Sequence, residues 1–322
     1  MEIDRKRIDY LDQMRGIAII LVVIGHVMQF SLGFGTSHLV DLIGIFHMPS
    51  FFFISGFLSY SSQNNRWFEL VFKRFKRLCV PFVVFSLAWC FCYQENWIEL
   101  LKWGGGRYWF LLVLFEVFAL FMFVDQLTKC IKKDYIRVLS FLFPIILLII
   151  LEKVYPTLEL YIHPVAKYYR YFIIGFFCSK YKNLDTCLFK NDFIYAVAFC
   201  VLILQWYFCS KNITILIFAG ALSGIVLLRY FCENYNGNNR IRMFLILIGK
   251  KSLLIYVLHY FFLVDISDIG HVVLDVSNGF FLQLITSIVI SFPIIFFCIV
   301  IGWFIESNKY LSIIMLGHNG RH

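Results

Sequence analysis

Arg15 and His26 are two ionisable side chains in the first apolar segment of the chain, where either would be costly without a function. Eleven residues at 100° each make three turns and about 20°, so on an α-helix both lie on one face, about 16 Å apart. Ionisable groups inside a membrane usually mark a substrate path, a proton relay or a binding site. We therefore expect this face to connect a membrane surface with the middle of the membrane.

His26 has the chemistry of a general base. A neutral imidazole can accept the proton of a hydroxyl as that hydroxyl attacks an acyl carbonyl. The alternative is a histidine that hydrogen-bonds to another helix and serves packing, but its place inside an apolar run favours function. Arg15 by itself is better explained as an anchor at the lipid headgroups. Asp12, one turn earlier, could orient its guanidinium or cap the helix.

The composition requires a membrane. Of the 322 residues, 61% are hydrophobic, 20% are aromatic and only 15% are charged, which is too little polar surface for a soluble globule. The net charge of +9 predicts no nucleic-acid partner, because no soluble basic face accompanies it. The ten cysteines form no C-x-x-C pair, so neither a metal site nor a disulfide framework is expected.

Apolar runs that could cross a hydrocarbon core of about 30 Å occur ten times along the chain. They lie near residues 14–33, 40–60, 79–97, 107–125, 137–151, 168–180, 192–209, 213–232, 244–264 and 279–305. Placing both termini in the cytoplasm puts 23 of the 29 Lys and Arg residues on the cytoplasmic side. Since backbone groups in lipid must be satisfied within each segment, the predicted fold is an all-α, polytopic membrane bundle of about ten helices.

The domain organisation is expected to be simple. The basic N-terminus and the first apolar run lack a cleavage site and are interpreted as a retained signal anchor. Residues 1–322 are then a single transmembrane domain with no soluble domain appended. Any chemistry must lie within the bundle or its loops.

The outer ends of the predicted helices gather aromatic, cationic and imidazole side chains. Aromatic residues at an interface usually form a membrane belt, but Trp and Tyr also stack on sugars, while Arg and His bond hydroxyls. Tyr256 and His259 share a helix face at i,i+3 and could serve either a pocket or packing. The candidates for a sugar-acceptor site are His47, Arg107, Trp109, Arg170, Tyr256 and His259.

Glu116 is the carboxylate deep in the fourth predicted span. A buried carboxylate must pair with a cation or take up a proton. Glu116 is therefore a catalytic candidate, as a partner for His26, for His259 or for a substrate hydroxyl. Structural pairing with a cation elsewhere in the bundle explains it equally well.

A basic loop precedes the third predicted span on the cytoplasmic side. It runs from Arg66 and carries Lys73, Arg74, Lys76 and Arg77. Such a loop is an ordinary positive-inside signal. It could also bind phosphate groups, and the two interpretations are compatible.

Two motifs carry a family resemblance. The segment R-G-I-A-I-x-L-V-V-x-x-H at 15–26 is followed by F-H-M-P-x-F-F-F-I-S-G-F at 46–57. Together they resemble the opening of the acyltransferase 3 family of integral-membrane O-acyltransferases, in particular the short fucose O-acetylase-like and intercellular-adhesion succinylase-like forms. Short echoes return at 107–111, 171–175 and 252–259, whereas the middle of the chain is only generically apolar.

The resemblance implies O-acyl transfer, with acetyl favoured over succinyl, from cytoplasmic acyl-coenzyme A to a hydroxyl of a cell-surface polysaccharide or lipid-linked glycan precursor. It makes Arg15 a ligand of the donor's phosphates or acyl carbonyl, and His26 the base. The basic residues near 73–77 would hold the adenosine end of this co-substrate. An acyl-enzyme on Ser55 is less favoured, since no base is evident beside it.

The same resemblance implies a multi-pass protein of the bacterial cytoplasmic membrane. Its partners would be the bilayer, acyl-coenzyme A and the glycan, with a homo-oligomer or a polysaccharide-synthesis complex also compatible. Two other classes of function stay open: a transporter or flippase of a lipid-linked sugar, and a non-catalytic partner of a polysaccharide synthase. Inverted repeats would favour a transporter, and none is evident.

Overall fold

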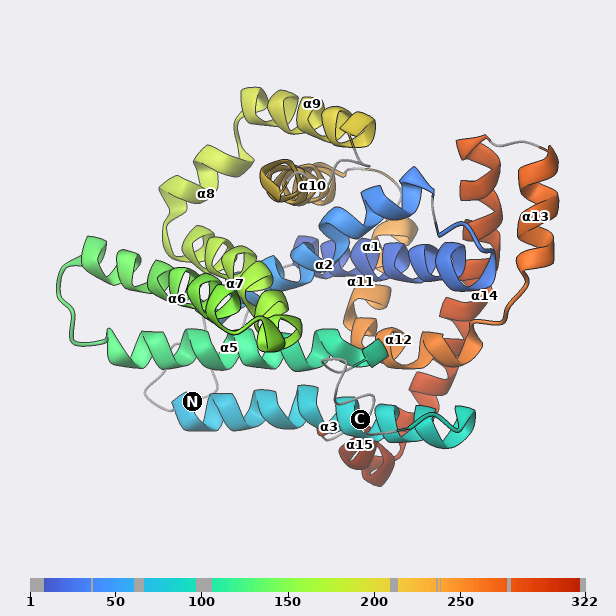
Figure 1. Cartoon of the computed structure of the whole chain (residues 1–322), viewed down its shortest axis with the longest axis horizontal. Coiled ribbons are helices and arrows are strands. Elements are labelled where there is room, and N and C mark those ends of the chain that lie inside the picture. Colours follow the sequence, from blue (N-terminus) through green and yellow to red (C-terminus); the bar gives the residue numbers. More distant parts are fainter. Residues whose placement is uncertain are drawn as a thin grey trace. The chain divides into compact units, whose positions relative to one another are not determined.

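The computed structural model describes residues 9–35, 37–60, 67–96, 106–208, 214–235, 237, 239–276 and 279–318 (Figure 1). Within these ranges every regular element is a helix, which confirms the predicted all-α class. The chain forms two compact units, residues 1–54 with 182–302, and residues 55–181 with 303–322. We call them unit 1 and unit 2.

Unit 1 contains the first motif, residues 46–54 of the second motif and most of the C-terminal half. Its elements are α1 (Asp9–His26), a π-helix η1 (Val27–Ser31), most of α2 (His38–Ser59), α8 (Lys182–Phe189), α9 (Asp192–Phe208), α10 (Thr214–Asn234), α11 (Asn239–Lys250), α12 (Ser252–Leu258), a 3₁₀ turn η6 (His259–Phe262), α13 (Ser267–Val276) and most of α14 (Phe280–Ser307).

Close packing of α1 against α11 organises unit 1, and glycine makes it possible. A Cβ on Gly16 would lie 2.2 Å from the Leu245 carbonyl oxygen, and one on Gly249 would lie 1.8 Å from that of Asp12. Only residues without a side chain allow two backbones to approach this closely, as is common between helices in membranes. The glycine beside Arg15 in the opening motif is therefore a packing residue.

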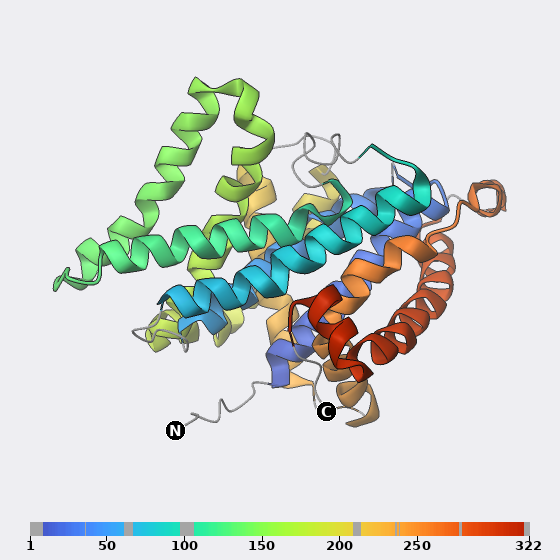
Figure 2. The same cartoon turned by 90° about the horizontal axis from the view of Figure 1, so that it is seen from below.

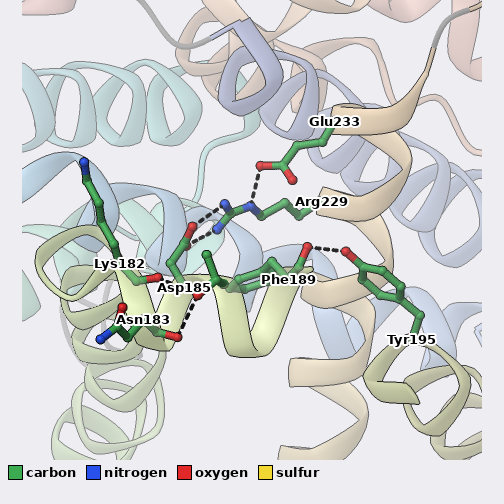
Figure 3. A network of polar contacts seen from close by, with 8 residues as sticks. Lys182, Asn183, Asp185, Phe189, Tyr195, Arg229 and Glu233 are labelled. Atoms are coloured by element: carbon green, nitrogen blue, oxygen red, sulfur yellow. Dashed lines mark hydrogen bonds and ion pairs between the residues drawn. The ribbon is translucent and has the colours of Figure 1, made fainter. Parts of the chain in front are cut away.

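Arg229 joins three segments of unit 1 (Figure 3). This buried guanidinium on α10 makes a two-pronged ion pair with Asp185 of α8, at 2.5 and 2.8 Å, and a third bond of 2.8 Å to Glu233. Phe189 and Tyr10 lie 4.1 and 5.1 Å from its charged carbon. Desolvated charge is tolerated here because it is paired and hydrogen-bonded.

Unit 2 consists of α3 (Trp67–Tyr93), a 3₁₀ turn η3 (Gly106–Tyr108), α5 (Trp109–Leu127), α6 (Asp134–Val154), a 3₁₀ turn η4 (Pro156–Leu158), α7 (Glu159–Lys180) and α15 (Lys309–Leu316). The helices α3 and α5 lie side by side, and α6 and α7 form a hairpin (Figure 2). Its core is aromatic: the ring of Phe121 contacts those of Phe141, Phe172 and Phe176.

Among the residues that the structure describes, seven helices are long and apolar enough to span a membrane, or up to nine if each of two bent pairs is one span. In the most apolar 18-residue stretch of each helix, only 11% of the residues of α6 and 28% of those of α14 are buried in the protein. Most of their side chains therefore suit a lipid environment. Together with the composition, these helices define an all-α, multi-pass membrane protein. The predicted span that does not qualify is 168–180, which lies in α7, a continuous helix that carries the charged residues Lys167 and Arg170.

Two predicted boundaries are wrong. The segment 244–264, expected as one helix, breaks at Lys251 into α11 and α12, and the span formed by α12 and η6 bends by 90° into α13. The basic segment before the third span is not a loop, because α3 already begins at Trp67. The turn signals are weak in both places, since Lys and Arg are good helix formers and Gly249, the glycine nearest the break, still lies within α11.

Candidate active site

His26 and His259 form a hydrogen-bonded imidazole pair in unit 1. His26 Nδ1 lies 2.8 Å from His259 Nε2, and the two rings are stacked with centroids 5.1 Å apart. The residues are 233 positions apart in the sequence. His26 is the last residue of α1, and His259 is the first residue of η6, where it is fully buried.

The backbone of α12 determines which nitrogens of this pair carry protons. His259 Nδ1 lies 3.0 Å from the Ile255 carbonyl oxygen, which can only accept, so Nδ1 is the protonated nitrogen. In the neutral ring Nε2 is then an acceptor, and His26 Nδ1 must donate to it. His26 therefore keeps Nε2 as a basic lone pair, which is the atom that a general base needs.

Tyr260 lies at that basic nitrogen. Its hydroxyl is 3.4 Å from His26 Nε2, and its ring contacts the His26 ring at 4.9 Å between centroids. Phe30, which is 45% exposed, contacts both rings from η1. The long hydrogen bond and the exposed phenyl ring leave a position beside Nε2 where a substrate hydroxyl could take the place of the tyrosine hydroxyl.

Irregular backbone supports the imidazole pair from both sides. The π-helix η1 follows His26 directly, and the Ile266 N–H donates to the Ser31 carbonyl at 2.9 Å. A Cβ on Gly270 would lie 1.9 Å from the Leu32 carbonyl oxygen, so α13 also packs closely here. Broken helices in membrane proteins occur where the backbone is buried in protein or lines a cavity, and π-helical turns are frequent at functional sites.

Arg15 is oriented from its own helix. Its Nη1 lies 3.3 Å from Asp12 Oδ1, and its side chain is 26% exposed against 5% for the carboxylate. The structure thus selects the orienting role of Asp12 over the capping role. The close approach of Gly249 to Asp12 places this pair at the α1–α11 contact.

Two predicted acceptor residues lie at the junction of η3 and α5 in unit 2: Arg107 is in η3, and Trp109 begins α5. The Arg107 guanidinium lies 4.4 Å from the Trp89 ring centroid and 3.7 Å from Glu95, while Trp109 stacks on Tyr168 at 5.3 Å. Arg170, on α7, turns back to donate to the Lys167 carbonyl at 3.0 Å. The result is a cationic and aromatic cluster at one end of the unit, in which Trp89 was not predicted.

The other predicted residues are distributed over both units. His47 Nδ1 lies 2.5 Å from the Ile43 carbonyl of its own helix α2, and Tyr256 is buried, with its ring 6.0 Å from that of His259. Glu116 lies on α5 in unit 2, so its predicted pairing with either histidine of unit 1 stays a prediction. No hydrogen bond to Glu116 occurs among the described residues of unit 2.

The predicted phosphate ligands occupy the first turns of α3. Lys73, Lys76 and Arg77 are exposed, Arg74 lies 5.0 Å from the Phe118 ring, and Lys76 lies over Phe72. The chain end supports them, because a Cβ on Gly317, just after α15, would lie 1.9 Å from the Lys76 carbonyl oxygen. Their exposure suits a phosphate ligand, but their role in binding one stays a prediction.

An acyltransferase is the class that the sequence matches. Residues 8–307 match the family described as the acyltransferase domain, and the chain belongs to this family. It is also similar to nodulation protein NolL of Mesorhizobium japonicum, at 25% identity over 307 residues, which is 81% of this chain and 78% of that protein. No solved structure matches the chain.

Proposed function

We propose that the protein is a membrane O-acyltransferase that moves an acyl group from cytoplasmic acyl-coenzyme A to a hydroxyl of a cell-surface polysaccharide or lipid-linked glycan precursor. The acyltransferase family membership supports the class of reaction. Acetyl is the proposed acyl group, with succinyl as the alternative. The proposed location is the bacterial cytoplasmic membrane.

The observation that carries the proposal is the hydrogen-bonded chain from the Ile255 carbonyl through His259 to His26 Nδ1. With both rings neutral, this chain assigns the His26 proton to Nδ1 and makes Nε2 the basic nitrogen. In the proposed reaction Nε2 takes the proton of the acceptor hydroxyl while its oxygen attacks the thioester carbonyl carbon. The C–S bond of the tetrahedral intermediate then breaks, and the leaving thiolate takes the proton back from the imidazolium. The products are the O-acyl ester and free coenzyme A, and the imidazole pair returns to its starting state.

Arg15 is the proposed contact for the donor. The Arg15 guanidinium is oriented by Asp12 and is 26% exposed, so a phosphate or an acyl carbonyl could reach it. Since Arg15 and His26 are eleven residues apart on α1, about 16 Å of helix separates them. The flexible pantetheine arm would follow this face from Arg15 to His26, so that the adenosine phosphates stay on the cytoplasmic side.

The test is the ester content of surface polysaccharide, measured by proton NMR in cells that express the wild type, His26→Ala, Arg15→Ala or His271→Ala. His271 is an exposed histidine of α13 and serves as the matched control. Loss of the ester signal in the first two variants, at unchanged membrane abundance and with the control intact, is the expected result.

Purified protein separates the rival functions. A transporter would leave acyl-coenzyme A intact and the glycan unmodified, whereas the proposed enzyme releases free coenzyme A in proportion to ester formed. Esters that persist in the His26→Ala variant would remove His26 as the base and favour an assembly partner of a synthase.

A further inference from the structure

Three distant segments of unit 1 meet around one indole ring that no predicted site includes. Trp206, near the end of α9, contacts the ring of His38 at 5.9 Å and that of Phe280 at 5.3 Å. Phe280 begins α14, and Gln283 follows one turn later. Ser37, just before α2, donates a hydrogen bond of 2.9 Å to Gln283 Oε1. The cluster therefore combines an aromatic floor with imidazole, amide and hydroxyl groups.

The hydroxyl of Ser37 holds the amide in one orientation. Its oxygen accepts the Leu39 N–H at 3.3 Å, and its proton goes to Gln283 Oε1. Gln283 is 8% exposed. With the carbonyl end of the amide engaged, Nε2 keeps two N–H donors, and neither is used by any residue that the structure describes.

Trp206 and His38 supply the other recognition groups. The Phe280 ring meets the indole edge-on at 80°, which fixes the plane of the indole ring. His38 is exposed, and neither its ring nitrogens nor the indole N–H bond to another described residue. No carboxylate, lysine or arginine takes part in the described contacts of this cluster, in contrast to the cationic Arg107 cluster of unit 2.

We propose that Ser37, His38, Trp206, Phe280 and Gln283 form the binding site for a neutral pyranose ring of the acceptor glycan. The indole face suits the C–H face of a pyranose, while the Gln283 amide and the His38 imidazole bond its hydroxyls. This inference rests on the proposed O-acyl transfer and names its acceptor class. A neutral amide and imidazole give no preference for a carboxylated sugar.

The cluster is joined to His26 through a compact stretch of chain. The Phe34 N–H donates to the Met28 carbonyl at 2.7 Å, and the Ser37 N–H donates to the Phe34 carbonyl at 2.9 Å. The first bond joins Phe34 to η1, which begins directly after His26, and the second joins Ser37 to Phe34. A glycan bound on Trp206 would therefore lie beside a chain segment that is hydrogen-bonded to η1, directly after His26, the proposed base.

Binding is tested without turnover, by saturation-transfer NMR of the purified full chain in lipid nanodiscs. The probes are the methyl pyranosides of glucose, galactose, mannose, N-acetylglucosamine and fucose. The variants are Trp206→Ala, Gln283→Leu and, as the matched control, Tyr207→Ala, which removes a 78% exposed ring from the same helix. Trp206→Phe is a more conservative variant, which keeps a smaller aromatic face and loses the indole N–H.

We expect at least one pyranoside to bind the wild type and Tyr207→Ala equally, at least tenfold more weakly to Trp206→Ala and Gln283→Leu, and with an intermediate affinity to Trp206→Phe. Wild-type protein that binds no pyranoside, or variants that bind as the wild type does, would overturn the site. The His26→Ala variant separates the two proposals. If it binds the pyranoside as the wild type does and still transfers the acyl group, His26 is not the base, while the proposed sugar site is unaffected.

Discussion

A single backbone carbonyl decides the proton arrangement of the imidazole pair. The Ile255 carbonyl accepts a hydrogen bond from His259 Nδ1, and His259 Nε2 accepts one from His26 Nδ1. The basic nitrogen of the pair is then His26 Nε2. His259 is thus a positioning residue: it orients the His26 ring and accepts a hydrogen bond from Nδ1–H, which favours the tautomer with its proton on Nδ1 rather than on Nε2. The same logic applies where a carboxylate orients a catalytic histidine.

Replacing His259 by Phe should lower kcat about 100-fold, because the His26 ring then loses the acceptor that selects its tautomer. KM for acyl-coenzyme A should stay within about twofold of the wild type, since the donor contact at Arg15 is untouched. Steady-state kinetics on purified protein, with coenzyme A release as the readout, measures both constants.

His259→Gln provides the rescue, because a glutamine oxygen can also accept the His26 Nδ1 proton. Its kcat should lie well above that of the Phe variant. Equal rates for the two variants would mean that His259 only fills space, and the tautomer argument would then be wrong.

At the residue scale, sequence reasoning singled out His26, Arg15 and His259 as candidates and placed the first two on one helix face, but it did not predict that the two histidines form a pair. His26 and Arg15 are conspicuous, because an apolar run carries them. His259 could be singled out only as a candidate sugar ligand or a packing residue, since a contact over 233 positions leaves no local pattern. Trp206, His38 and Gln283 were missed for the same reason: each looks like an ordinary residue at a membrane interface.

The α1–α11 contact determines whether the helix that carries the site is held in place. Gly249→Ala would put a methyl group against the Asp12 carbonyl, so we expect a loss of at least about 2 kcal/mol of stability. Gly44→Ala is the matched control, because nothing lies within 4 Å of the Cβ it would add on α2. Thermal unfolding in detergent should show the first variant destabilised by roughly 5 °C and the second unchanged or slightly stabilised.

The Arg229 network holds α8 and α10 together by paired charge. Arg229→Met should cost about 3 kcal/mol, because it leaves Asp185 and Glu233 with a poorly hydrated negative charge and no partner. The double variant Arg229→Met with Asp185→Leu should recover part of that loss. Thermal unfolding of the single and double variants checks this, and a double variant less stable than the single would contradict the pairing argument.

At the scale of elements, the sequence predicts that most of the helices exist, but it does not predict where they break. Long apolar runs identify most of the helices, because lipid leaves the backbone no other way to satisfy its hydrogen bonds. The π-helix after His26 and the break at Lys251 depend on what packs against them, such as the Ile266 N–H on Ser31. Tertiary contacts of this kind are absent from local sequence preference.

The number of spans determines on which side of the membrane the chain ends. Nine spans place the two termini on opposite sides, whereas ten place them together, and α7 makes the difference. The charge distribution favours ten, so we expect both termini in the cytoplasm. A green fluorescent protein fused to the C-terminus should then fluoresce, and alkaline phosphatase inserted after Tyr155 should be active.

If green fluorescent protein fused to the C-terminus does not fluoresce, and alkaline phosphatase fused to the C-terminus is active, α7 does not cross the membrane. In that case Arg170 would lie at a different depth from the one assumed for the outer sugar contacts. The family match, which spans residues 8–307 and therefore both units, does not depend on this count.

The bond between His26 Nδ1 and His259 also has a consequence for chemical labelling. A free imidazole reacts with an alkylating agent at either nitrogen and yields two regioisomers. Here one nitrogen is engaged by the second ring, so a small electrophile such as iodoacetamide should modify His26 only at Nε2, on the side where Tyr260 lies. NMR of protein labelled with ¹⁵N-histidine would show a single isomer, and a covalent inhibitor of this histidine would have one direction of approach.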